Sequence, residues 1–177
     1  MLLIHDGFGM IRWIYFPRSD RPTKLARQIV QAFEANASEI DSGSKTLESN
    51  DVLKIVSQAL AALDFRVEQG KSRSQKISVP VFFGLQGKPE KSFDADAFHS
   101  GEGFVVEVEA GRAVEGNQFL KDFFQACMMQ GVSYLAIAVR NRYRKGDNFE
   151  TVKTFFETLY ASRRLQLPLK GVLLIGY

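Results

Sequence analysis

Residues 93–111 read FDADAFHSGEGFVVEVEAG, and this stretch decides the fold and the chemistry that the rest of the chain supports. Two runs rich in valine, phenylalanine and alanine flank SGEG, a loop of small and polar residues, which is the pattern of a β-hairpin. With this four-residue loop, Asp96 lies opposite Glu107. The same register places Asp94 opposite Glu109, so acids occupy one face of both strands.

Carboxylates that converge in this way repel one another. Opposed Cβ atoms of paired strands lie about 4.5–5.5 Å apart, so the acids need a cation, a basic partner or raised pKa values. Oxygen ligands favour magnesium, manganese or calcium over zinc, for which the chain offers only the widely spaced His5, His99 and Cys127. The hairpin therefore predicts a site for Mg²⁺ or Mn²⁺. The alternative is a solvated edge hairpin whose charges have no function.

The apolar spacing along the chain predicts the elements around this hairpin. Helical spacing favours helices over 20–37, 50–63, 117–131 and 152–160. Short runs rich in β-branched and aromatic residues predict strands at 65–68, 76–84, 91–98, 103–109, 134–139 and 172–176. In the helix from Asn117, the spacing assigns the buried side to Leu120, Phe123, Phe124, Cys127 and Met128.

This order predicts an α/β fold, a mixed β-sheet flanked by helices, in which the hairpin is central or near-central. Residues 1–49 are predicted to be an N-terminal extension with a helix, and 50–177 to be the core. We expect both parts to form a single compact domain, because 177 residues suit one hydrophobic core.

Composition and charge exclude several classes of protein. Hydrophobic residues make up 45% of the chain and charged residues 24%, which is typical of a globular domain and excludes a disordered or membrane-embedded chain. The net charge of +3 is compatible with a polyanionic partner without requiring one. The single cysteine fits a reducing compartment, so we expect a cytoplasmic protein. His5, Asp6 and Arg12 interrupt the apolar start, which therefore predicts neither a leader peptide nor a membrane span.

The acids and the order of elements together resemble the PD-(D/E)xK nuclease superfamily, which includes most Type II restriction endonucleases. Members carry an acid on one strand and E-x-K on the next, and Asp96, Glu107 and Glu109 would fill these places. The resemblance covers about 50–177. It implies a restriction endonuclease-like sheet and metal-dependent hydrolysis of DNA phosphodiester bonds, in restriction, defence or repair, with RNA as the other substrate left open.

The resemblance also implies a ligand set. Asp96 and Glu107 would hold the metal together with the main-chain carbonyl of Val108, and Asp94 or Glu109 would complete the shell. The metal would activate a water molecule and neutralise the leaving oxygen.

Glu109 departs from the commoner pattern, because it stands where the family usually has lysine. A minority of restriction endonucleases carry E-x-E with a glycine soon after, here Gly111. A cation from elsewhere could serve in place of the lysine, and Lys121 and Lys71 are the candidates. The alternative for Lys121 is a surface residue paired with neighbouring acids.

Other residues predict contacts to nucleic acid. A basic run leaves the strand at 134–139, where it could bind phosphates or be merely solvated: Arg140, Arg142, Arg144 and Lys145. Asn117 and Gln118 begin the next helix after the acids, where amides could hold a phosphate, although Asn117 could equally be an N-cap.

Two other functions remain open from the sequence. One is a nuclease-fold module that has lost the chemistry and binds nucleic acid or a protein partner. The other is a metal-free structural domain. The residues do not decide between a monomer and a homodimer.

Overall fold

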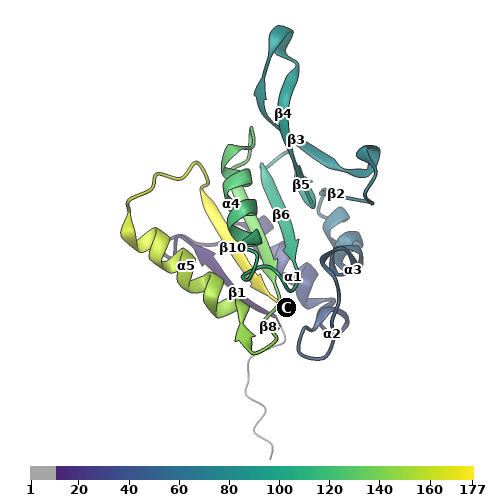
Figure 1. Ribbon diagram of the computed structural model, residues 1–177, viewed down its shortest axis with the longest axis vertical. Helices are drawn as coiled ribbons and strands as arrows, with labels where there is room; N and C mark the ends of the chain where they lie inside the picture. Colours follow the sequence, from purple (N-terminus) through teal and green to yellow (C-terminus); the bar gives the residue numbers. More distant parts are fainter. Residues whose placement is uncertain (1–10) are drawn as a thin grey trace, which may run out of the picture.

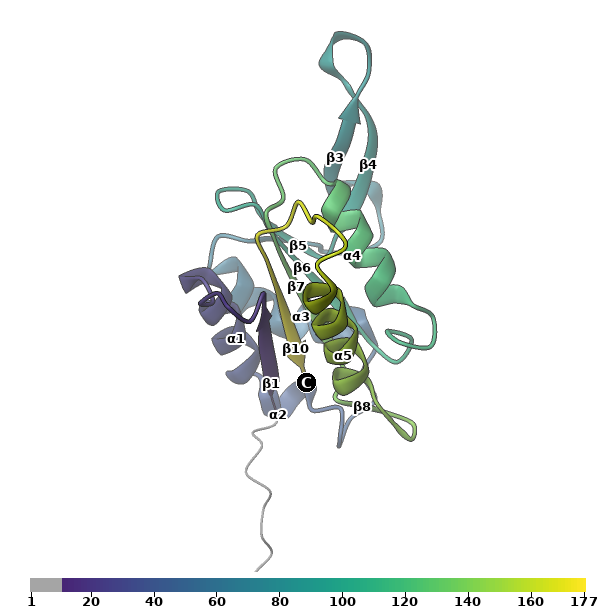
Figure 2. The same ribbon diagram turned by 90° about the vertical axis from the view of Figure 1, so that its left-hand side faces the viewer.

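The computed structural model describes residues 11–177, and the expectation that the apolar start is no leader peptide falls mostly on residues outside that range. A six-stranded mixed sheet lies between two layers of helices (Figure 1, Figure 2). The sheet order is β1-β10-β7-β6-β5-β2. Its strands are β1 (Arg12–Phe16), β2 (Arg66–Val67), β5 (Ala97–His99), β6 (Phe104–Glu109), β7 (Tyr134–Val139) and β10 (Gly171–Gly176).

Helices cover both faces of this sheet, which confirms the predicted mixed sheet flanked by helices. One layer holds α1 (Lys24–Glu34), α2 (Ala37–Ile40) and α3 (Ser49–Ala61). The other layer holds α4 (Gln118–Met128) and α5 (Asn148–Ser162), as Figure 2 shows from the side. Strand β6 is central, because it pairs with β5 on one side and with β7 on the other.

The pattern of β6 explains which face carries the acids. Val106 and Val108 belong to the core cluster under α1 and α3. Val105 belongs to the cluster under α4 and α5. Because successive side chains of a strand point to opposite faces, Glu107 and Glu109 lie on the face of α4. Strands β7 and β10 are apolar along their length and pair in parallel, as strands buried on both faces do.

The strand predicted over 91–98 is divided in the structure, which corrects the hairpin. Strand β5 pairs with β6 in the predicted register, with Ala97 opposite Val106. Strand β4 (Pro89–Ala95) instead leaves the sheet and pairs with β3 (Ile77–Phe83) in a separate ribbon that projects from the body (Figure 1). Asp94 therefore lies opposite Ser78 rather than Glu109. The chain bends at Asp96, so the two halves of the predicted strand enter different sheets.

The predicted buried side of α4 is wrong in part. Its buried residues are Phe119, Asp122, Phe123 and Ala126, whereas Phe124 of the predicted stripe is 51% exposed. Apolar residues occupy more than half of the helix circumference, so their spacing alone does not select the face that packs. The observed orientation turns Asp122 into the molecule.

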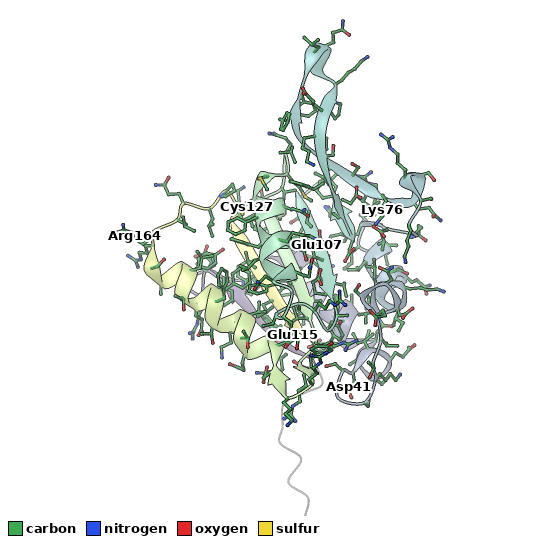
Figure 3. All side chains as sticks on the ribbon, in the orientation of Figure 1. Asp41, Lys76, Glu107, Glu115, Cys127 and Arg164 are labelled. Carbon is green, nitrogen blue, oxygen red and sulfur yellow. The ribbon has the colours of Figure 1, made fainter. Side chains whose placement is uncertain are left out.

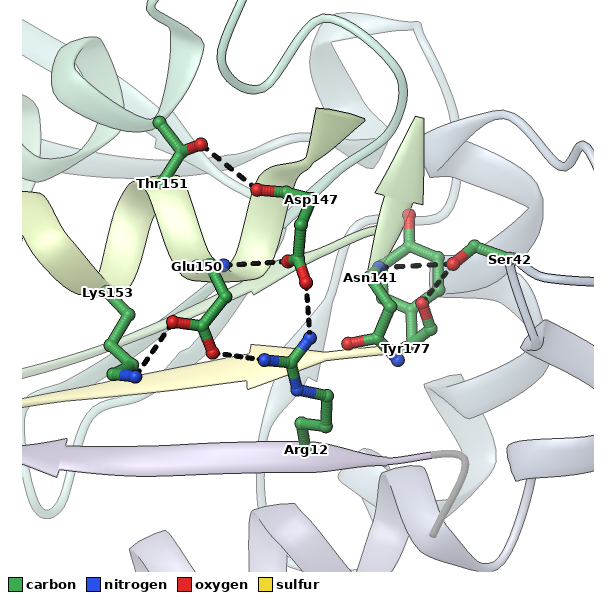
Figure 4. Close-up of polar contacts among 8 residues, drawn as sticks. All are labelled: Arg12, Ser42, Asn141, Asp147, Glu150, Thr151, Lys153 and Tyr177. Atoms are coloured by element: carbon green, nitrogen blue, oxygen red, sulfur yellow. Dashed lines mark hydrogen bonds and ion pairs between the residues drawn. The ribbon is translucent and has the colours of Figure 1, made fainter. Parts of the chain in front are cut away.

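Residues 11–49 contain the predicted helix, as α1, and add a strand that the sequence did not predict. Strand β1 pairs antiparallel with β10 at the edge of the sheet. Arg12 of β1 forms ion pairs with Asp147 at 2.9 Å and with Glu150 at the start of α5 (Figure 4). Ser42, after α2, contacts the main chain of Tyr177 and accepts a hydrogen bond from Asn141 N at 3.1 Å (Figure 4). These contacts fix this part of the chain to the C-terminal strand.

Gly103 provides a test of this packing. Its φ of 62° suits glycine, and a Cβ there would lie 2.1 Å from the carbonyl oxygen of Gly131. Gly87 has φ 70° with open space around it. Gly87→Ala should therefore lower the free energy of unfolding by about 1–2 kcal/mol, the cost of a left-handed backbone for alanine. Gly103→Ala should lose about 1–3 kcal/mol more, because backbone must move.

Thermal denaturation followed by circular dichroism checks this prediction, since about 2–4 °C is lost per kcal/mol in a domain of this size. Equal melting temperatures for the two variants would contradict the close approach of Gly103 to Gly131.

Candidate metal centre

A pocket of about 410 Å³ lies between the edge of β6, the base of β4 and helix α4. Figure 3 shows Glu107 beneath α4, with Lys76 on the segment that precedes β3. Acids and two lysines dominate the lining: Glu68, Asp94, Asp96, Glu107, Glu109 and Asp122, with Lys76 and Lys121. The structure therefore gathers acids from β4, β6 and α4 and from the segments beside β2 and β5.

Asp96 stands at the point where the β5–β6 ladder ends. Its Oδ2 accepts a hydrogen bond from Val108 N at 2.8 Å. Strand β5 begins at Ala97, so no strand pairs with β6 opposite Val108 on this side. The N–H and C=O of one strand residue point to the same side, so the Val108 carbonyl points toward the pocket that Val108 lines.

Burial raises the pKa of each acid on β6. Glu107 is only 8% exposed, and burial, followed by the charges of Asp96 and Asp122, holds its pKa well above the usual range. Burial raises the pKa of Glu109 to about 9, and a hydrogen bond to Asp122 adds to the shift. Burial also raises the pKa of Asp96 to about 6, although the hydrogen bond from Val108 opposes this. Glu109 therefore holds a proton near neutral pH, whereas Asp96 is largely ionised there.

Asp122 of α4 completes the buried cluster. It is 4% exposed, and its Oδ2 has no hydrogen-bond partner among the residues that the structure describes. Its Oδ1 lies 3.5 Å from Lys121 Nζ. A protonated Glu109 is the neighbour that can donate to this carboxylate, which is why their contact raises the Glu109 pKa. A buried carboxylate oxygen without a donor needs a proton or a cation.

The two lysines of the pocket have acidic partners. Lys76 Nζ donates to both oxygens of Glu68, at 3.0 and 2.9 Å, and this hydrogen bond raises the pKa of Lys76. Lys121 is more open, with 56% of its side chain exposed, and it also donates to Gln118 at 3.2 Å. Of the two lysines considered as substitutes for the missing cation, Lys121 lines the pocket and Lys71 does not.

The donor set fits a hard divalent ion. Within residues 11–177, no three aspartate, glutamate, histidine or cysteine side chains are already arranged to hold a metal ion. The pocket nevertheless combines buried carboxylates, an orphaned Asp122 oxygen and a main-chain carbonyl, which are ligands that Mg²⁺ and Mn²⁺ accept. Binding would require the acids to lose protons and turn toward one another.

The structure separates the other predicted residues. Asp94 is exposed on β4 and lies at the outer part of the pocket. Arg140 is buried, whereas the other three basic residues of its run lie on the exposed turn between β8 (Arg142–Tyr143) and β9 (Gly146–Asp147). One of these, Arg144, pairs with Glu115 at 3.0 Å. Asn117 is the N-cap residue of α4, at φ 52°, without a side-chain capping hydrogen bond, and Gln118 begins the helix.

Three residues of the pocket were missed from the sequence: Glu68, Lys76 and Asp122. Asp122 had a signal, because an acid lies between Phe119 and Phe123 on the side of α4 that is buried. Glu68 and Lys76 have no such signal. They lie on either side of a loop. Glu68 is held in place by a hydrogen bond from its main-chain N–H to the carbonyl oxygen of Asp96, at 2.8 Å.

A scan against known protein families matches none, and a search of curated proteins finds no relative. No helix within residues 11–177 is long and apolar enough to cross a membrane.

The raised pKa values predict how stability depends on pH. The folded state keeps a proton on Glu109 up to about pH 9, while the unfolded chain releases it near the usual value of 4.5. Stability without metal should therefore be greatest at low pH and fall as pH rises through this window. Asp122→Asn removes a negative charge and supplies a donor, so it should raise the melting temperature at pH 8 and flatten the pH profile.

Thermal melts between pH 5 and 9 in EDTA measure this effect, with Asp94→Asn as the matched control on the exposed ribbon. A melting temperature that rises with pH in wild type, or an Asp122→Asn variant no better than the control, would contradict the repulsion described.

Proposed function

We propose that this chain is a Mg²⁺- or Mn²⁺-dependent nuclease with a restriction endonuclease-like fold, which hydrolyses phosphodiester bonds of DNA. One observation carries the proposal: buried and half-buried carboxylates from β6, α4 and the β4–β5 bend face one pocket at the open edge of β6. Such a cluster is unfavourable on its own because the carboxylates repel one another. A bound divalent metal would compensate their charge and use them for catalysis.

Asp96 and Glu107 would hold the ion with the Val108 carbonyl, and Glu109 would complete the set from the same face of β6. Asp94 leaves this set, because it is exposed and lies opposite Ser78. A bound divalent ion would supply an acidified water molecule and stabilise charge on the leaving oxygen.

The protein's own residues would manage protons around that ion. Burial and the contact with Asp122 keep a proton on Glu109, and release of that proton would leave a carboxylate that can accept one from water. Lys121 lies at the exposed edge of the pocket, where its charge would face a phosphate of the substrate. Arg142, Arg144 and Lys145 lie on the exposed turn, where they would attract the polyanion.

The second candidate is a nuclease-fold module that binds nucleic acid or a protein without cutting. It is favoured by Glu109 in the place of the usual lysine and by the lack of a ready ligand set within residues 11–177. The two candidates differ in metal binding and in cleavage, so each can be tested separately.

Cleavage of supercoiled plasmid with Mg²⁺ or Mn²⁺ tests the first candidate, and single-stranded DNA and RNA run in parallel test the substrate. Asp96→Asn and Glu107→Gln should each lower the rate by at least about 100-fold, because each removes charge stabilisation at the metal. Glu34→Gln, on the exposed side of α1, is the matched control, and Asp94→Asn should keep most of its activity. Cleavage that survives in both Asp96→Asn and Glu107→Gln would place the active centre elsewhere.

Metal titration by calorimetry tests the site independently of activity. Because Glu109 holds a proton near neutral pH, Mg²⁺ or Mn²⁺ binding at pH 7.5 should release protons, seen as a heat that depends on the buffer. Glu109→Gln should bind more weakly and release fewer protons. Binding without proton release would contradict this site.

Glu109 also separates the active from the inactive module. In an active nuclease, Glu109→Ala abolishes cleavage. If wild type binds DNA and never cuts, Glu109→Lys becomes the informative variant, because it restores the commoner motif on the same face.

A further inference from the structure

A second pocket, of about 540 Å³, lies beside the candidate metal centre. We call it the arginine pocket after Arg112 and Arg140. Its other polar lining residues include Gln118, Tyr143 and the acids Glu48 and Glu109. Ser49 and Glu109 line both pockets. The two pockets are therefore neighbours. Acids dominate the first, whereas both arginines and acids line the second.

Arg140 is the unusual residue of this pocket. It is 5% exposed, and its guanidinium donates to the main-chain carbonyl of Leu47 and lies near the Tyr177 hydroxyl. No ion pair within residues 11–177 involves it, although seven ion pairs form elsewhere in that range. Glu48 and Glu109 line the same pocket, but neither forms an ion pair with Arg140 among the described residues. A buried guanidinium without a direct ion pair is costly, so an anionic ligand explains this position better than stability does.

The surrounding residues hold this guanidinium in place. Its Cζ lies over the Tyr143 ring, 5.5 Å from the centroid. The Tyr143 ring packs against Gly111, where a Cβ would come within 2.2 Å of a ring carbon. Gly111 therefore makes room for the ring, and the ring in turn positions Arg140. A rigid guanidinium loses little entropy when it binds.

The chemistry of the ligand follows from these groups. A guanidinium presents paired N–H donors that match phosphate oxygens, and Gln118 adds an amide while Arg112 adds an exposed charge at the rim. We propose that the arginine pocket binds a phosphodiester of the nucleic-acid strand next to the one at the metal centre. This proposal rests on the proposed nuclease function. It implies that the strand runs from the metal centre toward the arginine pocket.

DNA binding measured without cleavage tests the proposal. Fluorescence anisotropy of a labelled duplex and of a labelled single strand is recorded in EDTA, and again in Ca²⁺, over a range of salt. Arg140→Met should weaken binding about tenfold, as loss of a charged hydrogen bond does. It should also reduce the slope of log K against log salt by about 0.9 for duplex or 0.7 for single strand, which corresponds to one phosphate.

The matched control is Arg18→Met. Arg18 is an exposed arginine that follows β1 and pairs with Glu157 of α5. This variant loses the same charge and should change neither quantity appreciably. Arg140→Met should also melt close to the wild-type temperature in the absence of DNA, because the lost hydrogen bond to Leu47 opposes the gain from removing a buried charge. A purely structural arginine would give a large loss of stability.

If Arg140→Met does not fold, a second experiment tests the proposal. It uses Arg112→Ala and DNA in which a methylphosphonate makes one phosphate neutral. In wild type, one neutral phosphate position near the cleavage point should weaken binding, and Arg112→Ala should lessen that effect. Uniform sensitivity along the strand, an Arg140→Met variant that behaves like Arg18→Met, or no DNA binding in either condition would overturn the proposal. A wild type that binds with this pattern and never cuts leaves it standing and rejects the nuclease.

Discussion

The hydrogen bond from Val108 N to Asp96 Oδ2 is the interaction on which the rest of the site depends. A side chain there takes the place of a neighbouring strand, so the β5–β6 ladder stops at Ala97. The chain before Asp96 is then free to turn away and form the projecting ribbon of β3 and β4. The edge of β6 is left open where its acids lie, and α4 covers it with a further acid.

The resulting pocket concentrates charge at the expense of stability. Glu107 and Asp122 are buried, and the pKa values of Asp96, Glu107 and Glu109 are all raised. In the nearby arginine pocket, Arg140 is buried without a direct ion pair among the described residues, although Glu48 and Glu109 also line that pocket. Burial makes the charged forms of these carboxyl groups, and of this guanidinium, costly. The function we propose would relieve this cost, because a metal bound to a phosphodiester brings both a cation and an anion.

The predictable part of the fold came from long apolar patterns. Strands β7 and β10 and helix α3 lie where continuous or periodic apolar residues put them, because their burial needs no other information. Strand β1 was missed, since its five residues become a strand only by pairing with β10. The buried face of α4 was partly misassigned, because a helix with apolar residues around most of its surface is oriented by its neighbours.

The sequence by itself determined the register of the short hairpin and the face that carries Glu107 and Glu109, because strand alternation and a four-residue loop leave little choice. Only the tertiary structure decided that Asp94 leaves that face, that Asp122 lies there instead, and that Arg140 is buried. Those outcomes depend on a bend and on packing between residues far apart in the chain. Local spacing does not encode such contacts, since the free energy that selects them arises from burial in the assembled core.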